Sequence, residues 1–367
     1  MVAAPLRGLS GWLYAAAQRD VKQAKFLSAR RIVVICAGQG DTDRVNGKDM
    51  IATDNGFHEV VGLVADADAA ASRLIGALGY VQCHAGAVPP GALALTGMAP
   101  DAGAREVLIA HPDAARGSIR MISVEGAPAP LMRDGAQAWD SGGIFDINIR
   151  ALTDIAALHH GLGTAGYRAH APITDWDFGT LSVREVVETD ADGLCIALMQ
   201  RVHPPLAGYD GIGGNASWVF NSTQVVPDFA AARALFVDHL GWVPVQETEG
   251  FAGNAGGANC MGLPPSLAAT IPMRIGIYQA QGRMEGSVEV ISFGCGGNDF
   301  AAARPPQRGW AGLRFPVSDL DAFVRAMAAA ECEVSARHTF EWAPYGAVEA
   351  VAAITPWGAR FEALRPI

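Results

Sequence analysis

The chain contains the stretch Asp175-Trp176-Asp177-Phe178-Gly179 and, about 167 residues later, the stretch Glu341-Trp342-Ala343-Pro344-Tyr345-Gly346. In both stretches an acidic residue and a tryptophan precede an aromatic residue followed by glycine. A strand that ends in a glycine turn comes next in each case. A repeat at this spacing indicates an internal duplication, which decides the architecture before any local motif is considered.

The duplication extends upstream of both tryptophans. Residues 57–80 align without a gap with residues 219–242, and residues 117–124 align with residues 286–293. Agreement at several separate points is not expected by chance. The chain therefore consists of two homologous halves.

Each half is itself double, because a strand, a helix and further strands with period-2 alternation follow one another four times. The copies begin near Phe57, Phe145, Val219 and Gly312. In the last copy we expect Ser318 to cap the helix and Asp319 to favour its positive end. The sequence therefore predicts an α+β fold made of four βαβββ modules.

Glycine- and proline-rich linkers separate the modules and suggest the domain boundaries. We expect a first two-module domain over residues 55–203 and a second over residues 216–367. Residues 1–54 lie outside the repeat and are predicted to be an N-terminal extension, either flexible or upstream of a natural start near Met50. Residues 247–272 form a long loop rich in glycine and alanine, which is either a lid over a site or an insertion.

Composition narrows the possible functions. The net charge of −10 argues against a nucleic-acid partner, and no apolar run is long enough to span a bilayer. The six cysteines form no C-x-x-C pair, which favours reduced thiols in the cytoplasm. All lysines precede the repeat region, so a Schiff-base lysine within it is excluded.

With its four βαβββ modules and the aromatic-glycine endings of the second and fourth, the chain resembles the vicinal oxygen chelate superfamily over residues 55–366. This superfamily includes glyoxalase I, bleomycin- and fosfomycin-resistance proteins, and extradiol dioxygenases. The resemblance implies that modules pair into curved, cup-like half-barrel domains. It also implies that the mouth of a cup holds a divalent metal, which chelates two neighbouring oxygens of a substrate.

Metal ligands in this superfamily are usually a His or Glu near the start of a module's first strand and a Glu on its last strand. On the first strands this carries over to Glu59, Asp146, Asn221 and Gly312. On the last strands it carries over to Ala197 and Glu362. The metal candidates are therefore Glu59, Asp146 and Glu362. A further carboxylate, Glu289, is one residue out of step on the last strand of the third module, which favours an orientation away from the cup.

This set departs from the dioxygenase pattern of two histidines and a glutamate. One carboxylate and one amide make a poor site for iron or zinc. We therefore expect either no metal or a weakly bound divalent ion, with Mg, Mn, Fe and Zn not distinguishable. Oxygen activation is correspondingly less favoured than proton transfer.

The resemblance then implies an enzyme acting on a small metabolite that carries a carbonyl, enol or phenol group. Glu362, with His338, would move a proton, and Asn221 would orient or polarise the oxygen. Substrate-binding candidates are Trp342, Trp176, His170 and Glu289, although for each of them a packing role is the structural alternative.

Isomerase, epimerase or lyase chemistry is the favoured prediction. The alternatives are a metal-dependent dioxygenase or glyoxalase-type reaction, and a binding protein that sequesters a small molecule. The expected partner is a small-molecule substrate, with neither nucleic acid nor membrane involved. The chain is expected to be a monomer or a homodimer in the cytoplasm.

Overall fold

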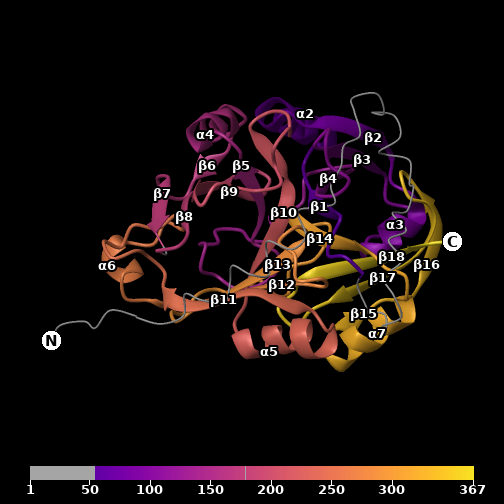
Figure 1. The fold of residues 1–367 in the computed structure, drawn as a ribbon. Coiled ribbons are helices and arrows are strands. Elements are labelled where there is room, and N and C mark those ends of the chain that lie inside the picture. Colours follow the sequence, from indigo (N-terminus) through magenta and orange to yellow (C-terminus); the bar gives the residue numbers. More distant parts are fainter. Residues whose placement is uncertain (1–53, 178) are drawn as a thin grey trace.

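The computed structural model describes residues 54–177 and 179–367. The extension predicted over residues 1–54 therefore lies outside the described residues, apart from Asp54. Within the described part, the helices and strands follow the predicted order of four modules (Figure 1).

Modules 1 and 2 make up the first half of the described chain. Module 1 consists of β1 (Glu59–Leu63), α2 (Ala67–Leu78), β2 (Val81–Ala87), the short helix α3 (Pro90–Leu95), β3 (Ala104–Ala110) and β4 (Ser118–Val124). Module 2 consists of β5 (Asp146–Ala151), α4 (Ile155–Thr164), β6 (Arg168–Ala169), β7 (Thr174–Asp177), β8 (Ser182–Thr189) and β9 (Cys195–His203).

Modules 3 and 4 repeat this order in the second half. Module 3 consists of β10 (Ala216–Val225), α5 (Phe229–Ala234) with the π-helical turn η1 (Leu235–His239), β11 (Val243–Phe251), α6 (Pro265–Ala268), β12 (Pro272–Gln279) and β13 (Ser287–Phe293). Module 4 consists of β14 (Gly309–Pro316), α7 (Leu320–Ala329), β15 (Glu333–Val334), β16 (His338–Trp342), β17 (Gly346–Ile354) and β18 (Arg360–Pro366).

The main helix of every module begins in the same way. An aspartate in extended conformation precedes it, and its carboxylate accepts a backbone N–H of the first turn: Asp66, Asp154, Asp228 and Asp319. Such a cap is worth about 1 kcal/mol to a helix. The cap of α7 is thus Asp319, which accepts from the Ala322 N–H, and the prediction of Ser318 was one residue too early.

The strands form two nine-stranded sheets, and each sheet combines one module from each half. The first sheet has the order β15-β17-β18-β14-β1-β4-β3-β2, with β16 attached to β17, and so joins modules 4 and 1. The second sheet has the order β11-β12-β13-β10-β5-β9-β8-β6, with β7 attached to β8, and so joins modules 3 and 2.

The sheets therefore do not follow the predicted domains 55–203 and 216–367, which paired consecutive modules. First strands meet across the halves instead: β1 runs antiparallel to β14, and β10 runs antiparallel to β5. Because all four modules share one hydrophobic pattern, the sequence cannot indicate which copies pair. The two curved half-barrels are present, with a different choice of partners.

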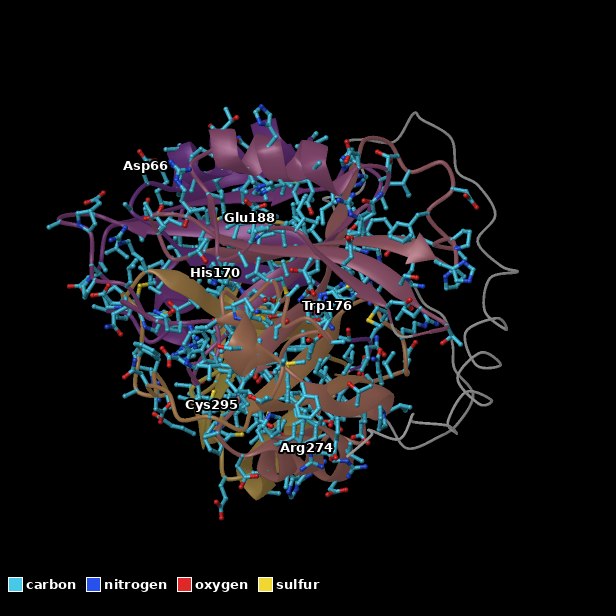
Figure 2. All side chains as sticks on the ribbon, turned by 90° about the vertical axis from the view of Figure 1, so that its left-hand side faces the viewer. Asp66, His170, Trp176, Glu188, Arg274 and Cys295 are labelled. Atoms are coloured by element: carbon cyan, nitrogen blue, oxygen red, sulfur yellow. The ribbon has the colours of Figure 1, made fainter. Side chains whose placement is uncertain are left out.

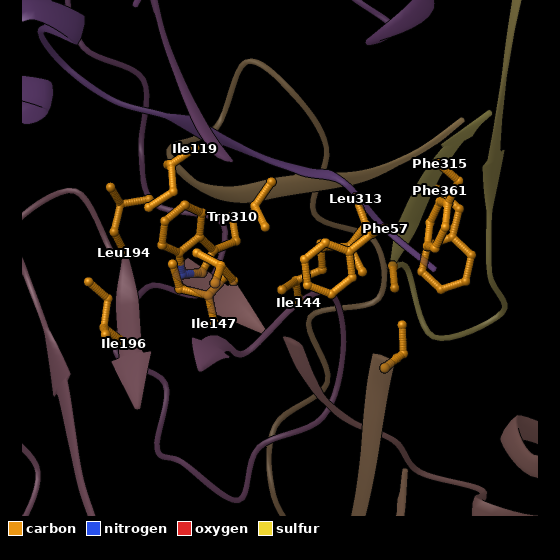
Figure 3. Packing of buried hydrophobic residues seen from close by; sticks show 14 of the residues in the cluster. Phe57, Ile119, Ile144, Ile147, Leu194, Ile196, Trp310, Leu313, Phe315 and Phe361 are labelled. Atoms are coloured by element: carbon orange, nitrogen blue, oxygen red, sulfur yellow. The ribbon is translucent and has the colours of Figure 1, made fainter. Parts of the chain in front are cut away.

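The main helices of all four modules and both sheets contribute to one shared hydrophobic core. In Figure 1, α2 and α4 lie together at one edge of the molecule, and α5 and α7 lie together at the opposite edge. Figure 3 shows Trp310, Ile147 and Leu194 packed at the centre of this core, where each side chain is nearly or fully buried. Full burial of one such side chain stabilises the fold by about 1.5–3 kcal/mol.

Among the described residues, no helix combines the length and the apolar character needed to cross a membrane. Cys195, Cys260, Cys295 and Cys332 are thiols that form no disulfide.

Candidate functional site

Each sheet has a concave face turned away from the shared core, and we call these faces the first cup and the second cup, after their sheets. Strand register gives equivalent positions in the two cups. In the first sheet Glu59 lies opposite Arg314, and Arg314 lies beside Glu362. In the second sheet Asn221 lies opposite Asn148, and Asn148 lies beside Ala197.

A further pair of equivalent positions lies on the last strands of modules 1 and 3. Ser118 is the register partner of Glu59, and Ser287 is the register partner of Asn221. Two residues further along these strands are Arg120 and Glu289. The centre of the first cup therefore holds two carboxylates and two guanidinium groups, which belong to Glu59, Glu362, Arg314 and Arg120. The equivalent positions of the second cup hold two amides, a carboxyl group and a methyl group, which belong to Asn221, Asn148, Glu289 and Ala197.

The charges of the first cup pair with one another. Arg120 donates to both carboxylate oxygens of Glu59, at 2.7 and 3.1 Å. Arg314 donates to Glu59 as well, and its Nε donates to Oε2 of Glu362 at 2.6 Å. A third carboxylate, Glu106, lies with Oε1 2.8 Å from Nη1 of Arg120. These side chains are essentially inaccessible to solvent, so they form a buried ionic cluster.

Aromatic residues of module 4 close this cluster. The Trp342 ring lies 3.7 Å from the Arg314 guanidinium carbon and 4.9 Å from that of Arg120, and its Nε1 donates to Glu106. The Tyr345 hydroxyl donates to Glu59 at 2.8 Å. Trp342 therefore covers the guanidinium groups of Arg314 and Arg120, and cation–π contacts and a hydrogen bond to a carboxylate hold its ring in place.

The first cup does not fit a metal ion at the predicted ligands. Burial by itself would raise the pKa of Glu59, but Arg120 and Arg314 lower it to about 2, so this carboxylate is charged and neutralised by arginine. Glu362 is likewise held by Arg314. A metal ion would have to lie next to these carboxylates, and in each case an arginine guanidinium already occupies that position.

In the second cup, Glu289 is the carboxylate at the equivalent of Arg120. Its neighbours Val288 and Val290 belong to the core between the sheets, so Glu289 points to the opposite, concave face. The sequence favoured an orientation away from the cup, and the structure corrects this. Glu289 is partly exposed, and its carboxyl group makes no hydrogen bond or ion pair with any described residue.

Next to Glu289 lies a network of polar groups on three adjacent strands. Thr223 pairs in register with Glu289 on one side and with Asp146 on the other. The Asn148 amide lies between the strands and donates to Asp146 at 3.0 Å, to Thr223 at 2.9 Å and to Asn221 at 3.2 Å. These contacts fix the Asp146 carboxyl group in the floor of the second cup.

Glu185 on β8 is the third carboxyl group of this cup. It accepts hydrogen bonds from Cys260, with Sγ 3.3 Å from Oε2, and from the Trp176 side chain. Trp176 is itself packed against the apolar cluster that fills this face, which includes Val187 and Ala197.

Burial makes all three carboxyl groups of the second cup weaker acids than usual. It raises the pKa of Asp146 to about 7, with hydrogen bonding by Thr223 acting in the opposite direction. Burial also raises the pKa of Glu185, and it raises that of Glu289 well above its usual value, assisted there by the charges of Asp146 and Glu185. The pKa of Asp146 allows this group to exchange a proton close to neutral pH.

The long loop predicted as a lid or an insertion lies over the second cup. Its residues Cys260 and Met261 pack on the concave face, and Ala252 and Leu263 form a small core of their own with Ala268. We call residues 252–271 the lid. Figure 2, which faces this side of the molecule, shows His170 and Trp176 among the side chains of this region.

His170 lies at the rim of the second cup. Its Nε2 is 2.7 Å from the Thr189 hydroxyl, and its ring meets Phe145 edge-on at 6.3 Å between centroids. Burial, assisted by the nearby Arg133, lowers the pKa of this histidine, so it is neutral at physiological pH. The lid reaches it, because a Cβ at Gly262 would lie 2.9 Å from the His170 carbonyl oxygen.

The predicted site residues thus separate into two groups. The first cup contains Glu59, Glu362 and Trp342, with His338 at the start of β16. The second cup contains Asp146, Asn221, Glu289, Trp176 and His170. Glu362 and His338 are therefore not brought together with Asn221, because they lie on different sheets.

Sequence reasoning missed Glu185, Asn148 and Cys260. Asn148 was detectable in principle, because it follows Asp146 by two residues and so shares its face of the strand. Glu185 and Cys260 come from the middle of module 2 and from the lid, where nothing in the sequence marks them as neighbours.

The second cup was also tested as a metal site. Among the described residues, no group of three or more His, Cys, Asp or Glu side chains is arranged to hold a metal ion. Asp146 and Glu185 are held by protein donors, and only Glu289 is available. The donor set therefore does not fit the divalent ion that the resemblance implies.

Comparison with solved structures identifies the fold. Glyoxalase I from Zea mays superimposes with a TM-score of 0.56 at 12% identity, covering 85% of this chain and 93% of that one. A "putative dioxygenase" from Bacillus subtilis superimposes with a TM-score of 0.52 at 12% identity, covering 87% of this chain and 86% of that one. The chain therefore has a fold similar to that of glyoxalase I.

No protein-family model matches the sequence. No curated protein matches it either. At this level of identity the structural likeness defines the fold and leaves the chemistry to be argued from the site.

Proposed function

We propose that the protein is an enzyme that moves a proton on a small metabolite bearing a carbonyl, enol or phenol group, and that the second cup is its active site. The proposal rests mainly on Glu289. Its carboxyl group has a raised pKa, is partly exposed and has no partner among the described residues. Asp146 lies on the other side of Thr223, and burial raises its pKa to about 7. An acid with a pKa near 7, such as Asp146, can take up and release a proton near neutral pH.

In this proposal the ionised form of Glu289 removes a proton from the carbon next to the substrate carbonyl, and the raised pKa makes this carboxylate a stronger base than an ordinary glutamate. Asp146 supplies a proton to the opposite face or to the oxygen, and Asn148 and Thr223 keep it in position. Return of the proton to a different carbon or face gives isomerisation or epimerisation, and loss of a β-substituent gives elimination. Trp176 supplies an aromatic wall, and the amide of Asn221 holds Asn148 in place.

The first cup has a structural role in this proposal. Glu362 and Glu59 hold Arg314, and Trp342 covers them, so none of these groups is available to a substrate without breaking the ionic cluster. His338 lies at the start of an edge strand and is assigned no chemistry.

Proton transfer is preferred to the metal-dependent reactions of glyoxalase I or of a dioxygenase because the donor set of neither cup fits a metal. A sequestering protein is the alternative from another class, and it predicts binding without turnover. A cytoplasmic location and a monomeric or homodimeric state remain part of the proposal.

The test measures exchange of carbon-bound hydrogen for deuterium in ²H₂O by ¹H NMR, using a panel of small 2-oxo, enol and phenol compounds. Wild-type protein should catalyse exchange with at least one of them. Glu289→Gln should lower the rate about 100-fold or more, as loss of a general base does. Glu333→Gln, which changes a carboxylate that is 76% exposed on module 4, serves as the control and should be without effect.

Two outcomes oppose the proposal. Equal exchange rates in wild type and Glu289→Gln would remove Glu289 from the chemistry. Tight binding of a compound by the wild type, with no exchange at any position, would favour the sequestering protein.

A further inference from the structure

Four arginines from three separate parts of the chain line one cleft at the junction of the two sheets. Arg133 comes from the linker between modules 1 and 2, Arg304 and Arg308 come from the linker between modules 3 and 4, and Arg360 begins β18. This cleft borders the first cup, because Arg360 and Glu362 lie on the same face of β18, and it lies outside the second cup. The inference drawn from it does not depend on the proposed function.

Two of these arginines are poorly neutralised. Arg133 donates to the carbonyl oxygens of Gly142 and Asp140, and it lies 5.4 Å from the centroid of the Phe300 ring. Arg360 is only 7% exposed and donates to the carbonyl oxygen of Leu95. Carbonyl oxygens satisfy N–H groups but carry no net charge, and neither arginine forms an ion pair with a described carboxylate.

The other two arginines, Arg308 and Arg304, are only partly neutralised by nearby carboxylates. Arg308 pairs with Asp192 at 2.6 Å, but Asp192 also pairs with Arg73. Arg304 lies 4.0 Å from Glu333, at the limit of an ion pair. The cleft thus concentrates positive charge in a chain whose net charge is −10.

Burial strengthens this conclusion. It lowers the pKa of Arg133 and of Arg360, which means that in each case the cost of desolvating the cation exceeds the help from nearby anions. Buried cations are normally paired, so a group of them with too few carboxylates lacks an anion.

The shape of the cleft indicates the size of that anion. The enclosed space is about 20 Å³, which suits one small group rather than a whole metabolite. The backbone forms much of the wall, because Gly142, Gly193 and Gly358 line it with positive φ angles of 102, 77 and 83°. A Cβ at Gly142 or at Gly358 would lie 2.4 Å from the backbone of Ala301, so larger residues are excluded there.

We propose that this cleft binds a tetrahedral oxyanion of the phosphate type through Arg133, Arg304, Arg308 and Arg360. The four guanidinium groups come from three segments of the chain, which suits an ion with several oxygens better than a planar carboxylate. Each of them retains N–H groups that donate to no described residue. The ion can be free, or it can be the phosphate group of a longer molecule that extends out of the cleft.

The test is isothermal titration calorimetry of the whole chain with inorganic phosphate, at constant ionic strength set with chloride. Arg304→Gln is the test variant, because its side chain is 38% exposed and its loss should not unfold the protein. Arg184→Gln is the matched control, since Arg184 is also 38% exposed and forms one ion pair, with Asp175. Circular dichroism in chloride verifies that both variants unfold at the wild-type temperature.

Wild type and Arg184→Gln should bind phosphate equally. Arg304→Gln should bind it about tenfold more weakly or worse, as expected for loss of a charged hydrogen bond. Arg304→Lys should recover part of the loss by restoring the charge. Titration with glycerol 3-phosphate shows whether the natural ligand is the free ion or a phosphate group of a longer molecule. Binding as tight as that of inorganic phosphate would indicate a longer molecule, and weaker binding would indicate the free ion.

Several results would overturn the proposal. They are an absence of heat with millimolar phosphate, equal affinities in wild type and Arg304→Gln, and equal losses in Arg304→Gln and Arg184→Gln. Tighter binding of acetate than of phosphate would likewise refute a tetrahedral site.

Discussion

Arg314 donates through Nε to the carboxylate of Glu362 at 2.6 Å, and both side chains are completely buried in the first cup. The same guanidinium also donates to Glu59, so one cation holds two carboxylates. In a low-dielectric interior such groups depend on one another, because each loses its hydration on folding. The first cup is therefore sensitive to removal of any single member.

We predict that Glu362→Leu destabilises the protein by about 3–5 kcal/mol, because it leaves Arg314 with one carboxylate fewer in the interior. Arg314→Met should cost a similar amount. The double variant should lose clearly less than the sum of the two, since it buries neither charge alone. Urea denaturation of the four proteins measures this coupling, and additive losses would show that the two side chains do not interact.

Asp146 provides a prediction about pH. Burial raises its pKa in the folded protein to about 7, above the usual 3.8 of the unfolded chain. The folded state therefore retains the proton longer, and the stability that this provides below about pH 4 declines as the pH rises through 7. Asp146→Asn removes this dependence, and at pH 8 it should stabilise the protein by about 2–4 kcal/mol.

Denaturation of wild type and Asp146→Asn at a series of pH values tests this expectation. The two curves should converge in acid and separate between pH 4 and 8. Parallel curves over this range would mean that Asp146 ionises normally in the folded protein.

A second buried acid lies on the helix side of the second sheet. Glu188 is inaccessible, with Oε2 3.1 Å from Nδ1 of His159 and with Oε1 lacking any partner in the described part of the chain. Burial raises its pKa to about 7, against the effect of His159. Glu188→Gln should therefore stabilise the protein by about 1–2 kcal/mol at pH 8 and not at pH 4.

His159→Gln is the informative companion to that variant. It removes the group that lowers the pKa of Glu188, so it should reduce stability at pH 8, in the opposite direction to Glu188→Gln. A change of the same sign in both variants would show that the pair is not coupled.

Two glycines of the lid provide a matched comparison. Gly262 has φ 79° and stands against the His170 carbonyl oxygen, whereas a Cβ at Gly256 would meet only the Asn254 side chain at 3.6 Å. Gly262→Ala should cost about 1–3 kcal/mol and loosen the lid, because it strains the backbone. Hydrogen exchange over residues 252–271 should accelerate in this variant and not in Gly256→Ala, and equal exchange would remove the contact with His170.

The sequence predicted the module pattern well, because that pattern is local. Aspartates such as Asp66 and Asp228 cap equivalent helices, and Gly79 and Gly241 follow those helices with positive φ, as the alignment of the two halves implied. The place of Glu362 on the last strand came from the resemblance and not from period-2 alternation, and in the structure it lies between Phe361 and Ala363, which belong to the shared core.

The contents of each cup could not be predicted in the same way. Glu59 contacts Arg314 because β1 pairs with β14, and no local sequence pattern predicts this long-range pairing. A carboxylate counted as a metal ligand thus became part of an ion pair. Glu289, one residue out of step in the count, became the free acid of the second cup.

Pairing across the halves makes the chain a covalently fused dimer, in which modules 1 and 2 act as one protomer and modules 3 and 4 as the other. Identical protomers would have to build two identical cups, since every substitution would appear in both. Fusion removes this constraint. The first cup carries an ionic cluster that neutralises itself, whereas the second carries a carboxyl group that pairs with no described residue, a difference that two identical subunits could not show.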